Sequence, residues 1–129
     1  LGNESVKVNR ADGLAIAEIK KLGIPQIIIS TEKNNVVQKR AEKLKLPCFH
    51  GAENKKTILL SYVKENNIEL ETVAYIGNDI NDYEVMTLVG IPIAPLDANE
   101  SIKEIAIFIT TAKGGNGVIR ELYNLIKQK

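Results

Sequence analysis

The segment 75–83 constrains the fold more than any other part of this sequence. The apolar run 73–76 has the length of a buried strand, and Gly77 ends it. Two carboxylates, Asp79 and Asp82, and two carboxamides follow before an apolar-periodic stretch that is typical of a helix. This order of strand, polar turn and helix indicates an α/β sheet, in which ligands bind at the carboxyl ends of the strands.

Two interpretations of the polar turn remain open from the residues alone. Asn78, Asp79 and Asp82 gather oxygen donors in a small volume, which suits a hard cation such as Mg²⁺. Alternatively, the same residues begin a helix, with Asn78 or Asp79 as the N-cap and Asp82 in a favourable first turn.

Strands and helices alternate along the rest of the chain. This alternation predicts one α/β domain over residues 1–129, with a mostly parallel sheet and helices on both faces. In the helix predicted for 35–44, we expect Val36, Val37, Ala41 and Leu44 to point inward. The other predicted strands are 4–9, 25–29, 47–50, 91–94 and 107–109, and the other predicted helices are 13–22, 54–67, 102–105 and 118–126.

Composition excludes several classes of function. The 17 basic and 16 acidic side chains give a net charge of +1, which argues against a nucleic-acid-binding surface. No apolar run is long enough to span a bilayer, and no signal-peptide pattern is present, so we expect a cytoplasmic protein without membrane contact. Cys48 is the single cysteine and is expected to be a buried small apolar residue, while the single histidine, His50, makes zinc binding improbable.

Polar residues also follow other predicted strands. Ser30 and Thr31 come directly after the apolar run 27–29, where hydroxyl groups bind an anion or cap the next helix. Lys55 and Lys56 lie at the start of a predicted helix, against the preference of the helix dipole. They are therefore either held for a ligand or simply exposed.

Two further features have a structural and a functional interpretation. Asp12 precedes an apolar-periodic helix and is well placed to cap it, but it is also a candidate for the site. Gly114 and Gly115 belong to a Gly-Gly-x-Gly turn before the last predicted helix. Such a turn can cradle phosphate, although its spacing does not match a dinucleotide fingerprint.

Taken together, these motifs give the chain a resemblance to a known family. It resembles the haloacid dehalogenase-like (HAD) phosphatases, and within them the cap-less branch. That branch includes phosphatases of 3-deoxy-manno-octulosonate 8-phosphate and of nonulosonate 9-phosphates, and the C-terminal domain of some acylneuraminate cytidylyltransferases. The motifs that carry the resemblance are 9–13, Ser30, Asn54-Lys55, Gly77-Asn78-Asp79 with Asp82, and 113–117 followed by Arg120-Glu121.

The resemblance implies a HAD-like Rossmannoid three-layer sandwich and a Mg²⁺-dependent phosphatase of a phosphorylated 2-keto-3-deoxy sugar acid. It also implies a homotetramer and a role in lipopolysaccharide biosynthesis. The transferred phosphoryl group carries spread negative charge, which a cation, a lysine and a hydroxyl stabilise. The implied residues are Ser30 and Lys55 for catalysis, Ser30, Thr31 and Lys55 for phosphate, Asn78, Asp79 and Asp82 for the metal, and Asp12, Gly114, Gly115 and Arg120 for substrate.

Two departures from the family pattern matter. The family nucleophile lies in an Asp-x-Asp-Gly motif on a central N-terminal strand, and this sequence has no such motif. We therefore expect a fragment that lacks this strand and does not hydrolyse phosphate as given. In addition, Asn78 stands where the phosphatases commonly have aspartate, which lowers the charge available to a metal.

These departures keep other hypotheses open. Asn78 resembles the domains that are fused to cytidylyltransferases, so the alternative is a non-catalytic oligomerisation domain. A receiver-like phosphate sensor is a weaker hypothesis, because it also needs an acceptor aspartate at a strand end. The identity of the sugar acid is not encoded in these motifs.

Overall fold

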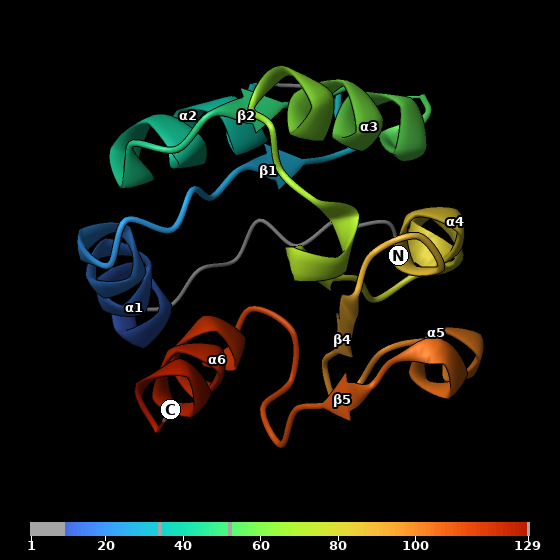
Figure 1. Cartoon of the computed structure of the whole chain (residues 1–129). Helices are drawn as coiled ribbons and strands as arrows, with labels where there is room; N and C mark the ends of the chain where they lie inside the picture. Colours follow the sequence, from blue (N-terminus) through green and yellow to red (C-terminus); the bar gives the residue numbers. More distant parts are fainter. Residues whose placement is uncertain (1–9, 34, 52, 129) are drawn as a thin grey trace. The chain divides into compact units, whose positions relative to one another are not determined.

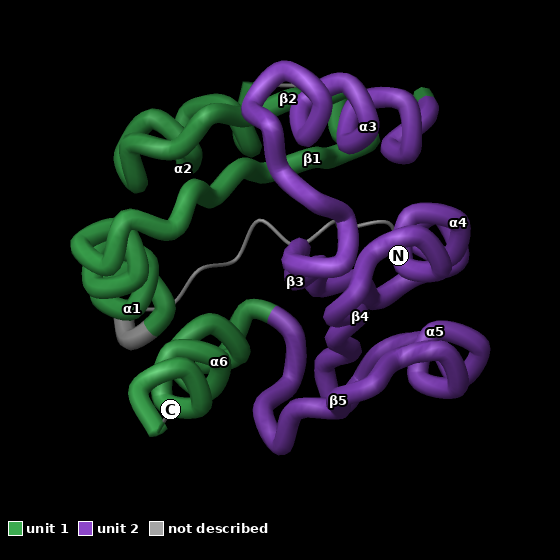
Figure 2. The backbone as a smooth tube through the Cα atoms, in the orientation of Figure 1, with its two compact units in different colours: residues 1–53, 115–129 green, residues 54–114 purple. Residues whose placement is uncertain are grey.

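A computed structural model describes residues 10–33, 35–51 and 53–128. The strand predicted for Glu4–Asn9 lies outside the described residues. The chain divides into two compact units, one formed by residues 1–53 with 115–129 and the other by residues 54–114 (Figure 2). Each unit is described by itself. No helix in the described part of the chain is both long and apolar enough to cross a membrane.

Within the residues that the structure describes, unit 1 combines two short strands with three helices (Figure 1). Its strands pair in parallel, with Ile28 opposite Cys48 and Ile29 opposite Phe49. Helices from the two ends of the described chain pack together around a cluster of Ala15, Ile19 and Tyr123. The elements are α1 (Arg10–Lys21), β1 (Ile28–Ile29), α2 (Val36–Leu44), β2 (Cys48–Phe49) and α6 (Val118–Lys127).

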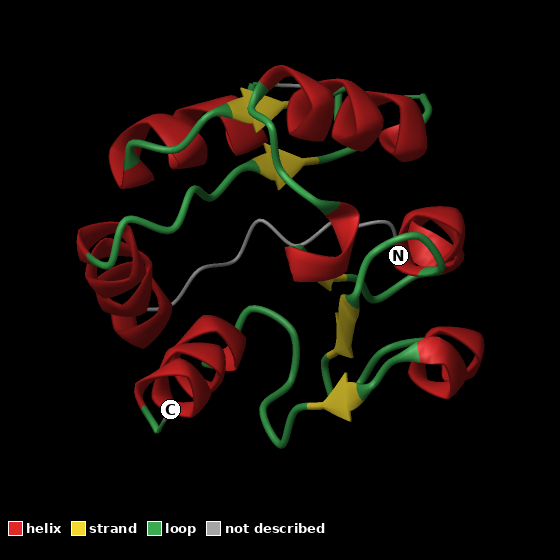
Figure 3. Cartoon of the chain, in the orientation of Figure 1, coloured by secondary structure: helices red, strands yellow, loops and turns green. Residues whose placement is uncertain are grey.

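Unit 2 is built around a parallel sheet of three strands in the order β3-β4-β5 (Figure 3). Its apolar core contains Met86, Ala94, Ala98 and Ile102. The elements are α3 (Lys55–Glu65), β3 (Ala74–Ile76), α4 (Tyr83–Met86), β4 (Ile91–Ala94), α5 (Glu100–Ile105) and β5 (Phe108–Ile109), with short 3-10 turns at Leu70–Thr72 (η1) and Ile80–Asp82 (η2). The predicted α/β class with parallel pairing is confirmed.

Asp12 makes the longest-range polar contacts in unit 1. Its carboxylate accepts hydrogen bonds from the backbone N–H groups of Gly117, Ile119 and Arg120 at 3.0, 2.9 and 3.1 Å. Asp12 lies inside α1, so the prediction that it caps its own helix is wrong. It caps α6, whose first N–H groups have no partner within the helix.

Burial corrects three further expectations. Val36 is 52% exposed because Val37 and Ala41, four residues apart, define the buried face of α2 and Val36 lies off it. The strand 74–76 is exposed to half-buried instead of buried, since β3 has one strand partner among the described residues, β4. Cys48 is half-buried, and this burial raises the pKa of its thiol, which lowers its thiolate fraction and its reactivity.

Close backbone packing in unit 2 requires glycine at position 90. A Cβ there would overlap the backbone carbonyl of Glu71, and the Gly90 N–H donates to Leu70 O at 2.9 Å. We expect Gly90→Ala to lower the free energy of unfolding by about 1–3 kcal/mol, because the backbone must shift to accept the methyl group. Urea unfolding followed by circular dichroism measures the change.

Gly13→Ala is the matched control for this prediction. Gly13 lies within α1, and a Cβ there meets its nearest neighbour, Leu44 Cδ2, at an ordinary 3.8 Å. Alanine is about 0.5–1 kcal/mol better than glycine inside a helix, so this variant should be at least as stable as the parent chain. Equal loss of stability in both variants would contradict the packing argument.

Candidate active site

The polar turn after β3 is a capped 3-10 turn. Asp79 is its N-cap residue, and Asp79 Oδ1 accepts a hydrogen bond from the Ile80 N–H at 2.7 Å. Asp82 completes a capping box by accepting from the Asp79 N–H at 3.3 Å. The helix-start interpretation of this turn is therefore what the structure shows, and it leaves the metal interpretation as a prediction.

Gly77 allows Asp82 to approach the end of β3. A Cβ at position 77 would lie 2.7 Å from Asp82 Cβ and 2.6 Å from Met86 Sδ, closer than real Cβ atoms come to other heavy atoms. The glycine that ends the strand thus gives the turn its tight path and brings Asp82 back under the strand end.

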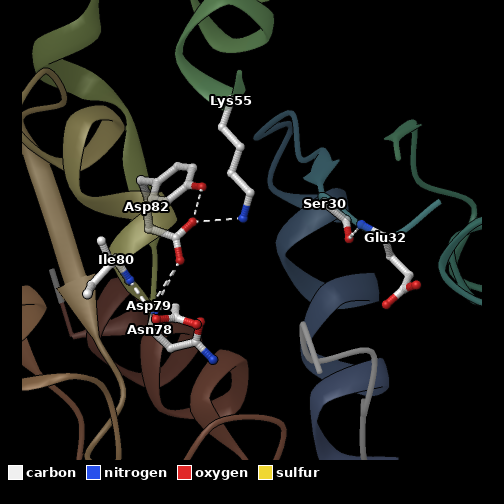
Figure 4. A network of polar contacts seen from close by, with 8 residues as sticks. Ser30, Glu32, Lys55, Asn78, Asp79, Ile80 and Asp82 are labelled. Carbon is white, nitrogen blue, oxygen red and sulfur yellow. Dashed lines mark hydrogen bonds and ion pairs between the residues drawn. The ribbon is translucent and has the colours of Figure 1, made fainter. Parts of the chain in front are cut away.

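Asp82 is the hub of the polar contacts in unit 2 (Figure 4). Its Oδ1 forms an ion pair with Lys55 Nζ at 2.9 Å and accepts from the Tyr75 hydroxyl at 2.6 Å. Its Oδ2 accepts from the Asn78 N–H at 3.0 Å and from the Asp79 N–H. Both carboxylate oxygens are therefore engaged, and the side chain is only 4% exposed.

Lys55 is the first residue of α3, as the sequence predicted, and its side chain is 5% exposed. The Asn54 side chain caps this helix by accepting from the Thr57 N–H at 3.1 Å. The neighbouring Lys56 is half-buried, with its side chain 40% exposed, and pairs with Glu84 at 3.4 Å. The two lysines thus differ: Lys56 belongs to the solvated surface, whereas Lys55 is held beside a buried carboxylate.

Ser30 and Thr31 belong to unit 1 and follow β1. Ser30 is buried, its N–H donates to Phe49 O at 2.9 Å, and its Oγ accepts from the Glu32 N–H at 3.0 Å. The residue at the N-cap of α2 is Asn35, so the interpretation of the hydroxyl pair as a helix cap is wrong. Their predicted role in phosphate binding stays a prediction.

The residues predicted to bind substrate are divided between the units. Asp12 caps α6 in unit 1, where the Arg120 guanidinium lies over the Tyr123 ring, 5.4 Å from its centroid. Gly115, also in unit 1, has a positive φ of 72°. Gly114 belongs to unit 2, and its N–H donates to Asp97 Oδ1 at 2.8 Å. No contact tests the substrate-binding role of these four residues.

One polar partner of Asp82 is not evident from the sequence. The pattern of residues places Tyr75 only in an apolar strand, yet its hydroxyl makes the shortest of these contacts to Asp82. The sequence signal for this contact is the hydroxyl group of Tyr75, which lies two positions before Gly77, the glycine that ends the strand. Its meaning depended on the path of the turn, which places Asp82 beside it.

Metal-binding side chains are sparse in this part of the molecule. Among the described residues, no group of three or more His, Cys, Asp or Glu side chains is arranged to hold a metal ion. A cation at the turn would therefore draw on the Asn78 amide, on water and on a bound anion as well as on carboxylate. This mixed set is usual for Mg²⁺, which binds through one or two carboxylates together with substrate phosphates and waters.

Comparison with known proteins identifies the family of this chain. The family model described as haloacid dehalogenase-like hydrolase matches residues 31–122. The 3-deoxy-D-manno-octulosonate 8-phosphate phosphatase KdsC of Yersinia pestis is 31% identical over 126 residues, which cover 97% of this chain and 67% of that protein. The enzyme of the same name from Escherichia coli strain K12 is 32% identical over the same shares.

A solved structure shows the same fold. The 3-deoxy-D-manno-octulosonate 8-phosphate phosphatase of Moraxella catarrhalis, in complex with a magnesium ion, a phosphate ion and a KDO molecule, superposes with a TM-score of 0.86 at 34% identity. The match covers 92% of this chain and 68% of that one. The chain therefore belongs to the haloacid dehalogenase-like hydrolases.

Proposed function

We propose that this chain carries the phosphate- and Mg²⁺-binding part of a phosphatase for a phosphorylated 2-keto-3-deoxy sugar acid. The single observation that supports this most is the buried Lys55–Asp82 ion pair beneath the capped turn of Asn78 and Asp79. A lysine held in this way keeps its charge at a defined place, as transfer of an anionic phosphoryl group requires. Similarity to phosphatases of 3-deoxy-D-manno-octulosonate 8-phosphate supports the choice of substrate class.

The donor set of the turn fits magnesium. Asp79 is exposed and Asn78 half-buried, so oxygen atoms of both side chains are offered to a hard cation, whereas Asp82 is buried behind them. Of the predicted ligands, we assign Asn78 and Asp79 to the metal and assign Asp82 chiefly to holding the turn and Lys55. Bound Mg²⁺ supplies neutralisation of the phosphate charge.

The roles of the other residues follow from their chemistry. Lys55, in unit 2, neutralises the phosphoryl group. For unit 1 we propose separately that the hydroxyl groups of Ser30 and Thr31 donate hydrogen bonds to phosphate oxygens. Family enzymes transfer the phosphoryl group to an aspartate of an Asp-x-Asp-Gly motif, which this sequence does not contain. For these 129 residues by themselves, the proposal is therefore binding of the substrate phosphate without turnover.

Calorimetric titration with inorganic phosphate, with and without Mg²⁺, tests the proposal. We expect phosphate binding that strengthens with Mg²⁺, and an Asp79→Ala variant that loses at least about tenfold of its Mg²⁺ affinity, as removal of a metal-site group typically does. Removal of Mg²⁺ with a chelator should lower phosphate binding by the parent chain to the level that the variant shows, and should change binding by the variant less.

Glu84→Gln is the matched control, because Glu84 is an exposed acid on the helix that follows the same turn. This variant should bind Mg²⁺ and phosphate like the parent chain. A chimera that adds a strand carrying an Asp-x-Asp-Gly motif should hydrolyse the sugar-acid phosphate. Absence of phosphate binding at any Mg²⁺ concentration would reject the proposal and favour the oligomerisation domain.

A further inference from the structure

We propose that Tyr75 is a positioning residue of this site, acting through Asp82 on the Asn78-Asp79 turn and on Lys55. The expected effect on ligand binding rests on the proposed function, whereas the contacts between Tyr75, Asp82 and the turn do not depend on it. Tyr75 has no assigned role in the predicted site, and all five residues belong to unit 2.

The hydroxyl of Tyr75 is held in place by its ring. Tyr75 lies in the middle of β3, and its ring packs against the core cluster of Met86, Ala94, Ala98 and Ile102. A tyrosine in this arrangement presents its polar end at the edge of an apolar core, with little freedom to move. The 2.6 Å distance to Asp82 Oδ1 is that of a charge-assisted O–H···O⁻ hydrogen bond.

The bond from Tyr75 determines which donors each oxygen of the Asp82 carboxylate accepts from. Lys55 and Tyr75 both donate to Oδ1, which leaves Oδ2 directed at the N–H groups of Asn78 and Asp79. Without the phenol, Oδ1 keeps the Lys55 ammonium as its strong donor, and the carboxylate can rotate toward it. The bond from the Asp79 N–H, already 3.3 Å long, is then the first to weaken.

Two consequences follow for ligand binding. The backbone of Asn78 and Asp79 loses its anchor, so their side-chain oxygens are presented to a cation less uniformly. In addition, the hydrogen bond from Tyr75 partly offsets the negative charge of Oδ1. Asp82 then neutralises less of the Lys55 charge, and Lys55 attracts an anion more strongly. Both effects act at a distance from the ligand, which makes Tyr75 a positioning residue and not a catalytic one.

Tyr75→Phe tests the inference because phenylalanine keeps the ring and removes only the hydroxyl. The backbone amide signals of Asn78 and Asp79 in ¹⁵N-¹H spectra should shift and their hydrogen exchange should accelerate, while β4 amides stay unchanged. Phosphate binding with Mg²⁺ should weaken about tenfold, as expected for one lost hydrogen bond to a charged group. Inorganic phosphate and Mg²⁺ are the ligands added, and the protein is this chain of 129 residues.

Tyr83→Phe is the matched control. Tyr83 begins α4 directly after the same turn and is 43% exposed, and its hydroxyl makes no hydrogen bond within the described residues. This variant should leave both the Asn78 and Asp79 signals and the phosphate affinity unchanged. Equal effects of the two substitutions, or unmoved turn amides in Tyr75→Phe, would overturn the inference.

The outcomes separate this inference from the proposed function. If the parent chain binds no phosphate but Tyr75→Phe still moves the turn amides, the positioning role stands and the proposed function falls. If Tyr75→Phe does not fold, incorporation of ring-fluorinated tyrosine replaces it, because the hydroxyl remains and its acidity changes. The turn amides must then shift in the fluorinated protein, and unshifted amides would overturn the inference.

Discussion

Lys55→Met is expected to lower the free energy of unfolding by about 3–5 kcal/mol, because it leaves the Asp82 carboxylate buried without its cationic partner. The two side chains are 5% and 4% exposed, so water cannot take over the role of the ammonium group. Methionine preserves most of the length and apolar contact of the lysine stem, so the loss reports on the charge. Equilibrium unfolding in urea measures it.

Lys56→Met is the control for this large effect. Lys56 follows Lys55 in the sequence and also pairs with an acid, but the side chains of Lys56 and Glu84 are 40% and 64% exposed. Exposed ion pairs contribute about 0–1 kcal/mol, so this variant should unfold close to the parent midpoint. A loss of similar size in both variants would show that burial of the Lys55–Asp82 pair is not what makes it important.

Asp12→Ala is expected to lower the free energy of unfolding by about 2–4 kcal/mol. The substitution removes a charged cap that accepts hydrogen bonds from the N–H groups of Gly117, Ile119 and Arg120. Asp12 is 2% exposed, so no solvent reaches the same position in its place. Besides the shift in unfolding free energy, hydrogen exchange should accelerate at these amides and along the first turn of α6.

Asp97→Ala provides the comparison within the same chain. Asp97 accepts one backbone hydrogen bond, from Gly114, and lies at the surface of unit 2. Asp97→Ala should lower the free energy of unfolding by no more than about 1 kcal/mol, and hydrogen exchange in α6 should not change. Equally fast exchange in α6 after both substitutions, or unchanged exchange there after Asp12→Ala, would mean that Asp12 does not act through its cap.

Local pattern was a good guide to the elements of this chain. The strand predicted for 91–94 is β4 with the same bounds, because glycine and proline limit its apolar run on both sides. The helix predicted for 118–126 is α6 almost to the residue. The placement of Lys55 at a helix start and of the acidic turn after a strand also followed from periodicity and from residues that end strands and begin helices.

The local sequence pattern does not predict contacts between distant segments. Asp12 has the residue type and position of a local cap, and the three N–H groups it actually satisfies lie 105, 107 and 108 residues further along. Tyr75 likewise has the composition of an ordinary strand residue until the turn brings Asp82 back to its hydroxyl. In both cases the local sequence gives the donor or acceptor, and the tertiary path decides the partner.

The carboxylate of Asp12 also has a consequence for synthesis of the chain. A ribosome releases α1 before α6, with all of unit 2 in between. Domains made of contiguous sequence fold as they emerge, so residues 54–114 are complete while the Ala15 and Ile19 face of α1 still lacks Tyr123. Until α6 arrives, this apolar face of α1 is open to aggregation and to capture by chaperones.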